Sequence, residues 1–219
     1  MIIYVFLAHP DDCELWAGGT LLKHVNKGDI VKSFVFYDIT KQRKMESIKA
    51  LDLLGITSFF YPVKTFSAPN IDSFLKDFTI EVPDLIITHW NLDSHIEHRS
   101  IFSFSTMLIH HWNRNKMRNK NGAYPILLMC STYFLLGENI MFHPNIIVDI
   151  TGVFDKKIKA IMHHKSQKVE VLIKDIESQN STFGSSIEKR YAEGFIEYPL
   201  FGKNKSLERN NLNELIKDM

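Results

Sequence analysis

"FLAHPDDCELWAGGTL", residues 6 to 21, decides the fold of this chain, because it joins a buried strand to a polar turn and then to a helix. The run IIYVFL at residues 2–7 is apolar throughout, which is typical of a strand covered on both faces of a parallel sheet. The turn AHPDD follows it, and leucine and valine at helical spacing predict a helix from Gly18 onward that ends at Gly28. Gly18 and Gly19 are interpreted as part of the close strand-to-helix turn, because the GxGxxG phosphate-binding pattern is missing.

The rest of the chain repeats this alternation. Apolar runs and helical periodicity predict strands at 30–37, 58–63, 83–90, 124–134 and 145–150, and helices at 41–55, 70–81 and 95–113. Thr151 is interpreted as a helix N-cap, and the tail from about residue 170 as a helix plus loops with a polar end. We therefore expect one α/β domain over residues 1–219, Rossmann-like, with a mostly parallel, doubly wound sheet and helices on both faces. Its core should cover about 1–168, and 169–219 should be a C-terminal helix and loop extension.

Composition limits the classes of partner. The chain has 26 Lys and Arg against 25 Asp and Glu, so it lacks the basic field that nucleic-acid binding usually needs. Cys13 and Cys130 lie far apart without CxxC spacing, which favours a reducing compartment over a disulfide scaffold. The apolar start is too short to span a bilayer and is followed by acidic residues, so we expect neither a signal peptide nor a membrane anchor. A cytoplasmic protein with a small-molecule partner is predicted, and its oligomeric state stays open, with a homo-oligomer as one option.

Two polar clusters follow predicted strands. His9, Asp11 and Asp12 come after the first strand, and His95 and His98 come after the strand at 83–90, with helical spacing between them. Ligands of such sheets bind beyond the carboxyl ends of the strands, so the clusters should lie at one edge. A catalytic zinc site typically uses three N or O ligands and leaves a position for water, which suits metal-assisted hydrolysis. Taken singly, each cluster also fits an ordinary role, as a surface histidine pair or a capped turn.

The motifs carry a family resemblance. AHPDDCELWAGGTL, followed by THWNLDSHIEHRS, resembles the two signatures of the PIG-L/LmbE family of zinc-dependent N-deacetylases. RKMESIKALDLLG is similar to the family's RxxExxxAxxLG helix, and NIIVDIT with the later HHKSQ resembles its VDIT and HxSQ stretch. The resemblance covers roughly residues 3–168.

This resemblance implies a function and a set of roles. It implies that the chain removes the N-acetyl group from an N-acetylated amino sugar of N-acetylglucosamine type, or from its glycoside, with one zinc ion per chain. By position, His9, Asp12 and His98 would be the zinc ligands. Asp11 would be the general base, and His95 would stabilise the oxyanion or protonate the leaving amine.

Three further residues are assigned to substrate binding. Arg43 matches the family arginine that contacts the sugar, with a solvated helix residue as the alternative. Glu97 stands where the family usually has aspartate, and its role is left open. His164 closes over the site by resemblance, or is favoured at a helix C-terminus for ordinary electrostatic reasons. The Gly-rich acidic stretch that the family commonly has after the second strand is missing beyond Asp38, so part of the substrate rim differs.

Other functions stay open beside this one. A metal-dependent amidase or deacylase acting on another small amide would need the same residues. A catalytically inactive metal or sugar-binding module would not need a base beside the ion, so Asp11 and His95 together argue against it. The N and O ligand set would also accept iron or cobalt.

Overall fold

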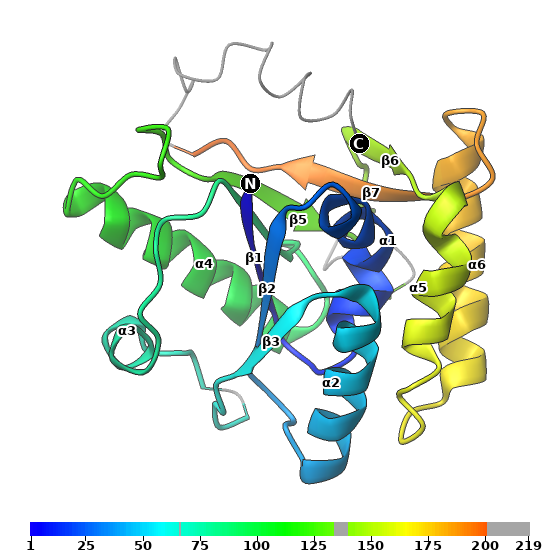
Figure 1. Cartoon of the computed structure of the whole chain (residues 1–219), viewed down its shortest axis with the longest axis horizontal. Coiled ribbons are helices and arrows are strands. Elements are labelled where there is room, and N and C mark those ends of the chain that lie inside the picture. Colours follow the sequence, from blue (N-terminus) through cyan, green and yellow to red (C-terminus); the bar gives the residue numbers. More distant parts are fainter. Residues whose placement is uncertain (66, 134–139, 201–219) are drawn as a thin grey trace.

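A seven-stranded sheet forms the centre of the molecule in the computed structural model, which describes residues 1–65, 67–133 and 140–200 (Figure 1). The strands are β1 Ile2–Leu7, β2 Ile30–Val35, β3 Thr57–Phe60, β4 Leu85–His89, β5 Ile126–Cys130, β6 Ile146–Asp149 and β7 Ala192–Glu197. Their order across the sheet is β3-β2-β1-β4-β5-β7-β6. The neighbours from β3 to β5 pair in parallel, whereas β7 runs antiparallel to both β5 and β6. The predicted mixed α/β architecture is confirmed, and β7 is the departure from a parallel sheet.

Helices cover both faces of the sheet (Figure 1). They are α1 Asp12–Asn26, α2 Lys41–Leu54, α3 Ile71–Asp77, α4 Ile96–Arg114, the 3-10 turn η2 Thr151–Val153, α5 Phe154–Ile161 and α6 Val169–Ser185. Alternate residues of β1 point to opposite faces, so Val5 packs in the core beneath α1, α5 and α6, and Phe6 packs in the aromatic core beneath α3 and α4. Since β1 lies between β2 and β4, the strand order reverses at β1, where α/β sheets bind ligands.

Three expectations need correction. Helix α1 begins at Asp12, so Gly18 and Gly19 lie inside the helix and not in the turn before it. Thr151 begins the 3-10 turn and is not the N-cap of α5. The expected helix and loop extension at 169–219 contains β7, which lies inside the sheet between β5 and β6. The expected polar end at 201–219, and the end of the strand expected at 124–134, lie outside the described residues.

A buried glutamate on β7, Glu193, is hydrogen-bonded to the backbone in the middle of α1. The carboxylate oxygens of Glu193 accept hydrogen bonds from the backbone N–H groups of Gly19 and Thr20, at 2.8 and 2.7 Å. The same carboxylate pairs at 2.7 Å with Lys157, whose ammonium group also donates to Asn180 at 2.9 Å. Burial lowers the pKa of Lys157, and the neighbouring Glu193 opposes this effect. The network joins β7, α5 and α6 to the helix that begins at the candidate site.

Gly19 and Gly18 form a matched pair for a stability prediction. A Cβ at Gly19 would lie 2.8 Å from two side-chain carbons of Ile150, whereas a Cβ at Gly18 would meet its nearest neighbour at 3.5 Å. Gly19→Ala is therefore expected to lower the free energy of unfolding by about 1–3 kcal/mol through overpacking. Gly18→Ala should leave it unchanged or raise it by up to about 1 kcal/mol, because alanine favours helix. Urea denaturation measures both, and equal effects of the two substitutions would contradict the packing argument.

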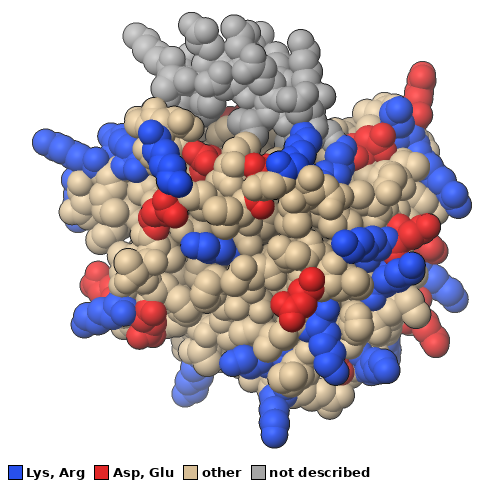
Figure 2. All heavy atoms as spheres, viewed as in Figure 1, with Lys and Arg blue, Asp and Glu red and all other residues tan. Residues whose placement is uncertain are grey.

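Charge is spread over the face of the molecule that Figure 2 shows. On the face shown in Figure 2, basic and acidic side chains are interspersed, and neither kind gathers into one large patch. Among the described residues, no helix combines the length and apolar character needed to cross a bilayer.

Candidate metal centre

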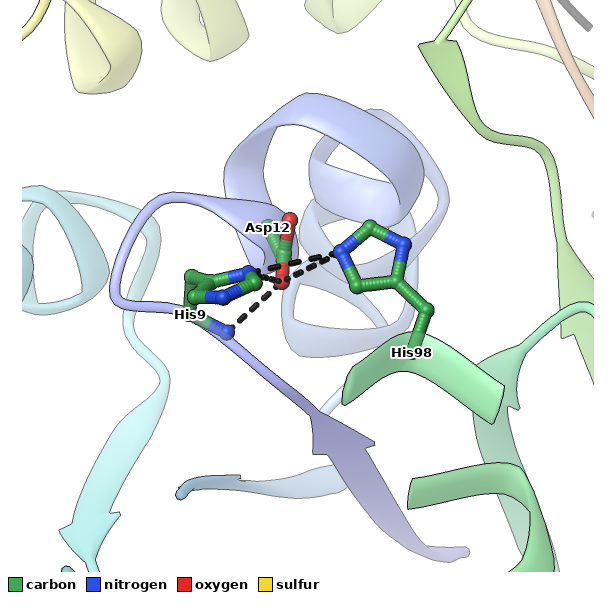
Figure 3. Close-up of side chains that lie close together, drawn as sticks. All are labelled: His9, Asp12 and His98. Atoms are coloured by element: carbon green, nitrogen blue, oxygen red, sulfur yellow. Dashed lines mark hydrogen bonds and ion pairs between the residues drawn. The ribbon is translucent and has the colours of Figure 1, made fainter. Parts of the chain in front are cut away.

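The carboxyl ends of two neighbouring strands bring the polar clusters together. Strands β1 and β4 pair in parallel, so the loop after β1 and the loop after β4 leave the sheet side by side. His9 lies in the first loop, Asp12 is the first residue of α1, and His98 lies in the first turn of α4. The three side chains converge from these separate elements, as Figure 3 shows. Asp12 and His98 are fully buried, and His9 is largely buried.

The donor atoms have the spacing of a tetrahedral metal site. His9 Nδ1 lies 3.2 Å from Asp12 Oδ2 and 3.3 Å from His98 Nε2, and the third side of the triangle, from His98 Nε2 to Asp12 Oδ2, measures 3.6 Å. Ligands bound at zinc distances in a tetrahedral shell are about 3.3 Å apart. Three protein donors also leave the fourth position of such a shell for water or substrate. The residues present therefore fit a catalytic zinc ion.

Carboxylates orient both histidines. Glu97 Oε2 lies 2.8 Å from His9 Nε2, and Asp93 Oδ2 lies 2.8 Å from His98 Nδ1. Because an ionised carboxylate only accepts hydrogen bonds, each of these ring nitrogens carries a proton. The other nitrogen of each ring, His9 Nδ1 or His98 Nε2, is then the atom that can offer a lone pair to a metal. This arrangement is the one that metal-binding histidines usually have, and it is the strongest structural argument for the site.

Neutralising one of these carboxylates should weaken metal binding. Asp93→Asn and Glu97→Gln are each expected to raise the Kd for zinc by about 10–100-fold, since a neutral amide is a weaker acceptor than a carboxylate and fixes the ring and its tautomer less firmly. Glu81→Gln is the matched control, because Glu81 forms an exposed ion pair with Lys120 and precedes β4, whereas the site follows the opposite end of that strand. Competition with a chromophoric chelator measures the affinities. An unchanged Kd in both site variants would contradict the assignment.

Asp12 is held by several donors besides the two histidines. Its Oδ2 accepts the backbone N–H of His9 at 2.7 Å, and its Oδ1 accepts the indole N–H of Trp16 at 3.0 Å. Burial opposes the charged form, but His98, His89 and His9 outweigh it and hold the pKa of Asp12 well below its usual value. Asp12 is therefore an anion over the physiological pH range and can act as a charged ligand.

Metal binding should release a proton from His9. Burial lowers the pKa of His9, but Asp12 and Glu97 outweigh it and raise the pKa to about 9. Nδ1 must lose its proton to become a ligand, so below pH 9 each unit of falling pH should weaken zinc binding by about tenfold. Chelator competition at pH 6, 7 and 8 measures the slope. A Kd that does not change with pH after correction for the chelator would contradict the raised pKa.

Asp11 lies beside the centre and faces a basic residue. One Arg43 nitrogen donates to Asp11 Oδ1 at 2.9 Å, and another pairs with Asp38, so the guanidinium bridges the two carboxylates. Burial and the adjacent Asp12 raise the pKa of Asp11, and Arg43 counteracts them. A buried carboxylate with a raised pKa next to a candidate metal position is suited to accept a proton.

The remaining predicted residues lie around this centre. His95 is exposed at the start of α4, its ring centroid 5.0 Å from that of His9 and 4.6 Å from that of His98. Burial and His98 lower its pKa. His164 is buried, with Nε2 3.2 Å from Glu14 Oε1, so it contacts a carboxylate of α1 and does not lie at an open rim. Glu97 contacts His9, although the sequence left its role open.

Three residues of the centre were missed by the sequence reasoning. Asp93 accepts the backbone N–H of His95 with Oδ1 at 2.8 Å while Oδ2 holds His98. His89 stacks on His98 with centroids 3.7 Å apart, and its Nε2 accepts the backbone N–H of Ala8 at 2.8 Å. Burial and His98 lower the pKa of His89 to about 4, so this ring is neutral. Trp16, bonded to Asp12, is the third. The spacing Asp93, His95, His98 in the sequence was the available signal for Asp93.

The fold and the site together define an α/β protein with a candidate His, Asp, His metal centre at the carboxyl ends of its central strands. Residues 4–109 match the PIG-L family, described as GlcNAc-PI de-N-acetylase, and they carry a domain of that family. The match includes both polar loops and the RKMESIKALDLLG helix, so the resemblance of these motifs is confirmed, whereas the NIIVDIT and HHKSQ stretches lie beyond the matched residues.

Solved structures share the fold at low sequence identity. The chain resembles GalB, the 4-carboxy-2-hydroxymuconate hydratase from Pseudomonas putida, with a TM-score of 0.75 at 18% identity, over 93% of this chain and 98% of that one. It also resembles the N,N'-diacetylchitobiose deacetylase from Pyrococcus horikoshii, with a TM-score of 0.72 at 21% identity, over 94% and 88% of the two chains. A conserved protein from Thermus thermophilus gives a TM-score of 0.71 at 19% identity, over 94% and 99%.

Proposed function

We propose that this protein is a zinc-dependent hydrolase that removes the N-acetyl group from an N-acetylglucosamine-type sugar or its glycoside. The observation that carries the proposal is the triangle of donor atoms from His9, Asp12 and His98, with Asp11 beside it and a carboxylate behind each histidine. The family description, which names a de-N-acetylase of an N-acetylglucosamine lipid, supports the substrate class. The diacetylchitobiose deacetylase shares the fold and agrees with it.

The chain's own residues would divide the reaction as follows. His9, Asp12 and His98 would hold the ion, which when bound supplies a Lewis acid for the amide carbonyl and acidifies water. Asp11 would take the proton of the attacking water, and Arg43 would keep its carboxylate turned toward the reacting atoms. His95, exposed at the mouth, would donate an N–H to the carbonyl oxygen as negative charge develops there. The leaving amine would receive its proton from Asp11 or His95.

Arg43 would also contribute to substrate binding. Its guanidinium bridges Asp11 and the exposed Asp38, so it spans from the buried base to the surface. A sugar hydroxyl could replace the Asp38 oxygen as its acceptor without disturbing the bond to Asp11. His164 would have an indirect role. It contacts Glu14 and would help to position the first turn of α1 next to Asp11.

The fold alone does not select this reaction, because a hydratase shares it with a TM-score of 0.75. Amine release from N-acetylglucosamine, its methyl glycoside and diacetylchitobiose is the test, with metal-stripped protein and with protein reloaded with zinc. Turnover that requires reloading would support the proposal. Bound zinc with no amine released from any of these amides would overturn it, and a parallel assay that follows hydration of a conjugated unsaturated carboxylate by loss of absorbance would then test the other chemistry.

A further inference from the structure

A cavity of about 190 Å³ lies between α1 and α6 and belongs to none of the roles above. Leu15 and Trp16 of α1 form one wall, and Leu172 and Ile176 of α6 form the other. Tyr133, which follows β5, closes one side. Polar side chains of α6 line the remainder: the half-buried Asp175, the buried Gln179, and the exposed Ser178 and Thr182. The cavity thus has apolar walls and a rim that reaches solvent.

Two aromatic side chains connect the cavity to the metal centre. Trp16 lines it and at the same time donates its indole N–H to Asp12 Oδ1 at 3.0 Å. Tyr133 packs edge-to-face on Trp16 with centroids 4.7 Å apart, and its ring lies nearly parallel to that of His98 with centroids 6.4 Å apart. The cavity therefore lies one aromatic side chain away from two of the three candidate ligands, Asp12 and His98.

The wall that contains Tyr133 is fixed by hydrogen bonds. The side chain of Gln179, which also lines the cavity, accepts from the Ser131 hydroxyl at 3.0 Å and donates to the Thr132 carbonyl at 2.9 Å. Both polar atoms of this buried amide are used to hold the two residues before Tyr133. The cavity therefore has a fixed backbone next to Tyr133 on one side and is open to solvent at Ser178 and Thr182.

The size and the walls determine what could bind. An apolar cavity of about 150 Å³ is large enough to hold benzene, so this one admits a single ring or a short alkyl chain, but not a second sugar together with it. Leu15, Leu172 and Ile176 have no polar groups to offer, and Trp16 already uses its N–H on Asp12. We propose that this cavity binds an apolar group, about one six-membered ring in size, attached to the amide substrate. The proposal rests on the proposed deacylation, which it deepens.

The test compares substrates that differ by one ring. Methyl and phenyl β-glycosides of N-acetylglucosamine place the ring on the sugar's aglycone, and N-acetyl and N-benzoyl glucosamine place it on the acyl group. Burying a ring of this size should raise kcat/KM for the phenyl member of one pair by roughly 10- to 100-fold over its partner. The pair of substrates that shows the higher kcat/KM for its phenyl member identifies which end of the substrate, the aglycone or the acyl group, enters the cavity.

Two substitutions on α6 supply the filled cavity and its control. Leu172→Trp fills the cavity. It should reduce the ratio of kcat/KM for phenyl over methyl, or for benzoyl over acetyl, to the value set by the chemical reactivity of the two substrates alone. Val171→Trp adds the same bulk at the adjacent position, where the side chain is 53% exposed and does not line the cavity, and should leave the ratio unchanged. Thr182→Trp, at an exposed lining position, is the second filling variant if Leu172→Trp does not fold.

Equal values for both members of each pair in the native protein would overturn the proposal, as would a ring preference that survives both filling variants. If no amide is hydrolysed, the proposed deacylase function is contradicted, but the cavity proposal is not. Titration calorimetry on metal-free protein then tests whether the cavity binds an apolar ring. Phenyl β-glucosaminide should bind at least tenfold more tightly than the methyl compound and lose this advantage in the filled variant. Equal binding of the two would overturn the cavity proposal independently of any activity.

Discussion

Asp11→Asn is expected to lower kcat/KM for amide hydrolysis by about two to four orders of magnitude, with zinc content still close to one ion per chain. The amide keeps the size of the side chain and can still contact Arg43, but it cannot take a proton from water. Asp11 is not among the three residues whose donor atoms converge, so its loss should not empty the site. Initial rates of amine release and elemental analysis of the same protein samples measure both quantities.

Asp38→Asn is the matched control for this change. Asp38 pairs with the same guanidinium as Asp11, but its side chain is half exposed. The same substitution there should change kcat/KM by less than about tenfold, since an exposed ion pair contributes little. If Asp11→Asn lost the zinc, Asp11 would be a ligand and the proposed base would have to be sought elsewhere.

His98→Ala is expected to have the opposite signature, with loss of both zinc and turnover. It removes one of three donors, so the Kd for zinc should rise by more than the roughly 10–100-fold expected for Asp93→Asn, which disturbs only the orientation of the same ring. His111→Ala, a substitution of the same kind farther along α4, should retain both metal and activity. Equilibrium dialysis against zinc followed by elemental analysis checks the prediction, and stoichiometric zinc in His98→Ala would refute the ligand assignment.

Strands with uniform apolar character could be predicted from the sequence, and strands with buried charge could not. β1 and β4 are buried along their whole length, which requires continuous apolar runs that are easy to recognise. β7 contains Glu193 and Gly194, which usually mark exposed loops. Glu193 is tolerated there because Lys157 and two backbone N–H groups satisfy its carboxylate, and those partners are distant in the sequence. Such partners appear only once the chain is folded.

The start of α1 shows a different difficulty. Asp12 and Glu14 lie in its first turn, where negative charge is favoured by the helix dipole, so a signal for the helix start was present. Asp12 was interpreted instead as part of a turn that binds metal. Asp12 in fact serves as both the first helical residue and a candidate ligand. The position of the glycines inside the helix follows from this, and Gly19 is explained by its close approach to Ile150.

The candidate metal ligands could be predicted from the sequence, but most of the residues that hold those ligands in place could not. His9, Asp12 and His98 do converge, as their positions after two strands suggested. The second carboxylate, Asp93, and the stacked His89 were not recognised, because their roles depend on ring orientation and burial. Glu97 was assigned to substrate binding with its role left open, and the structure shows that it contacts His9. Spacing in the sequence identifies which groups meet, whereas hydrogen-bond geometry decides which atom of each ring is free to bind.

The position of β7 has a consequence for the order in which the molecule can be assembled during synthesis. Every donor of the candidate metal centre lies within the first 98 residues, whereas the strand that joins β6 to β5 spans Ala192–Glu197. On the ribosome, β5 therefore emerges long before its antiparallel neighbour and keeps an unpaired edge in the meantime. Glu193, whose carboxylate accepts hydrogen bonds from the middle of α1, lies on β7 and is therefore also synthesised late. The parallel half of the sheet and the metal-binding loops can thus form early, but α1 is secured only when nearly the whole described chain has been made.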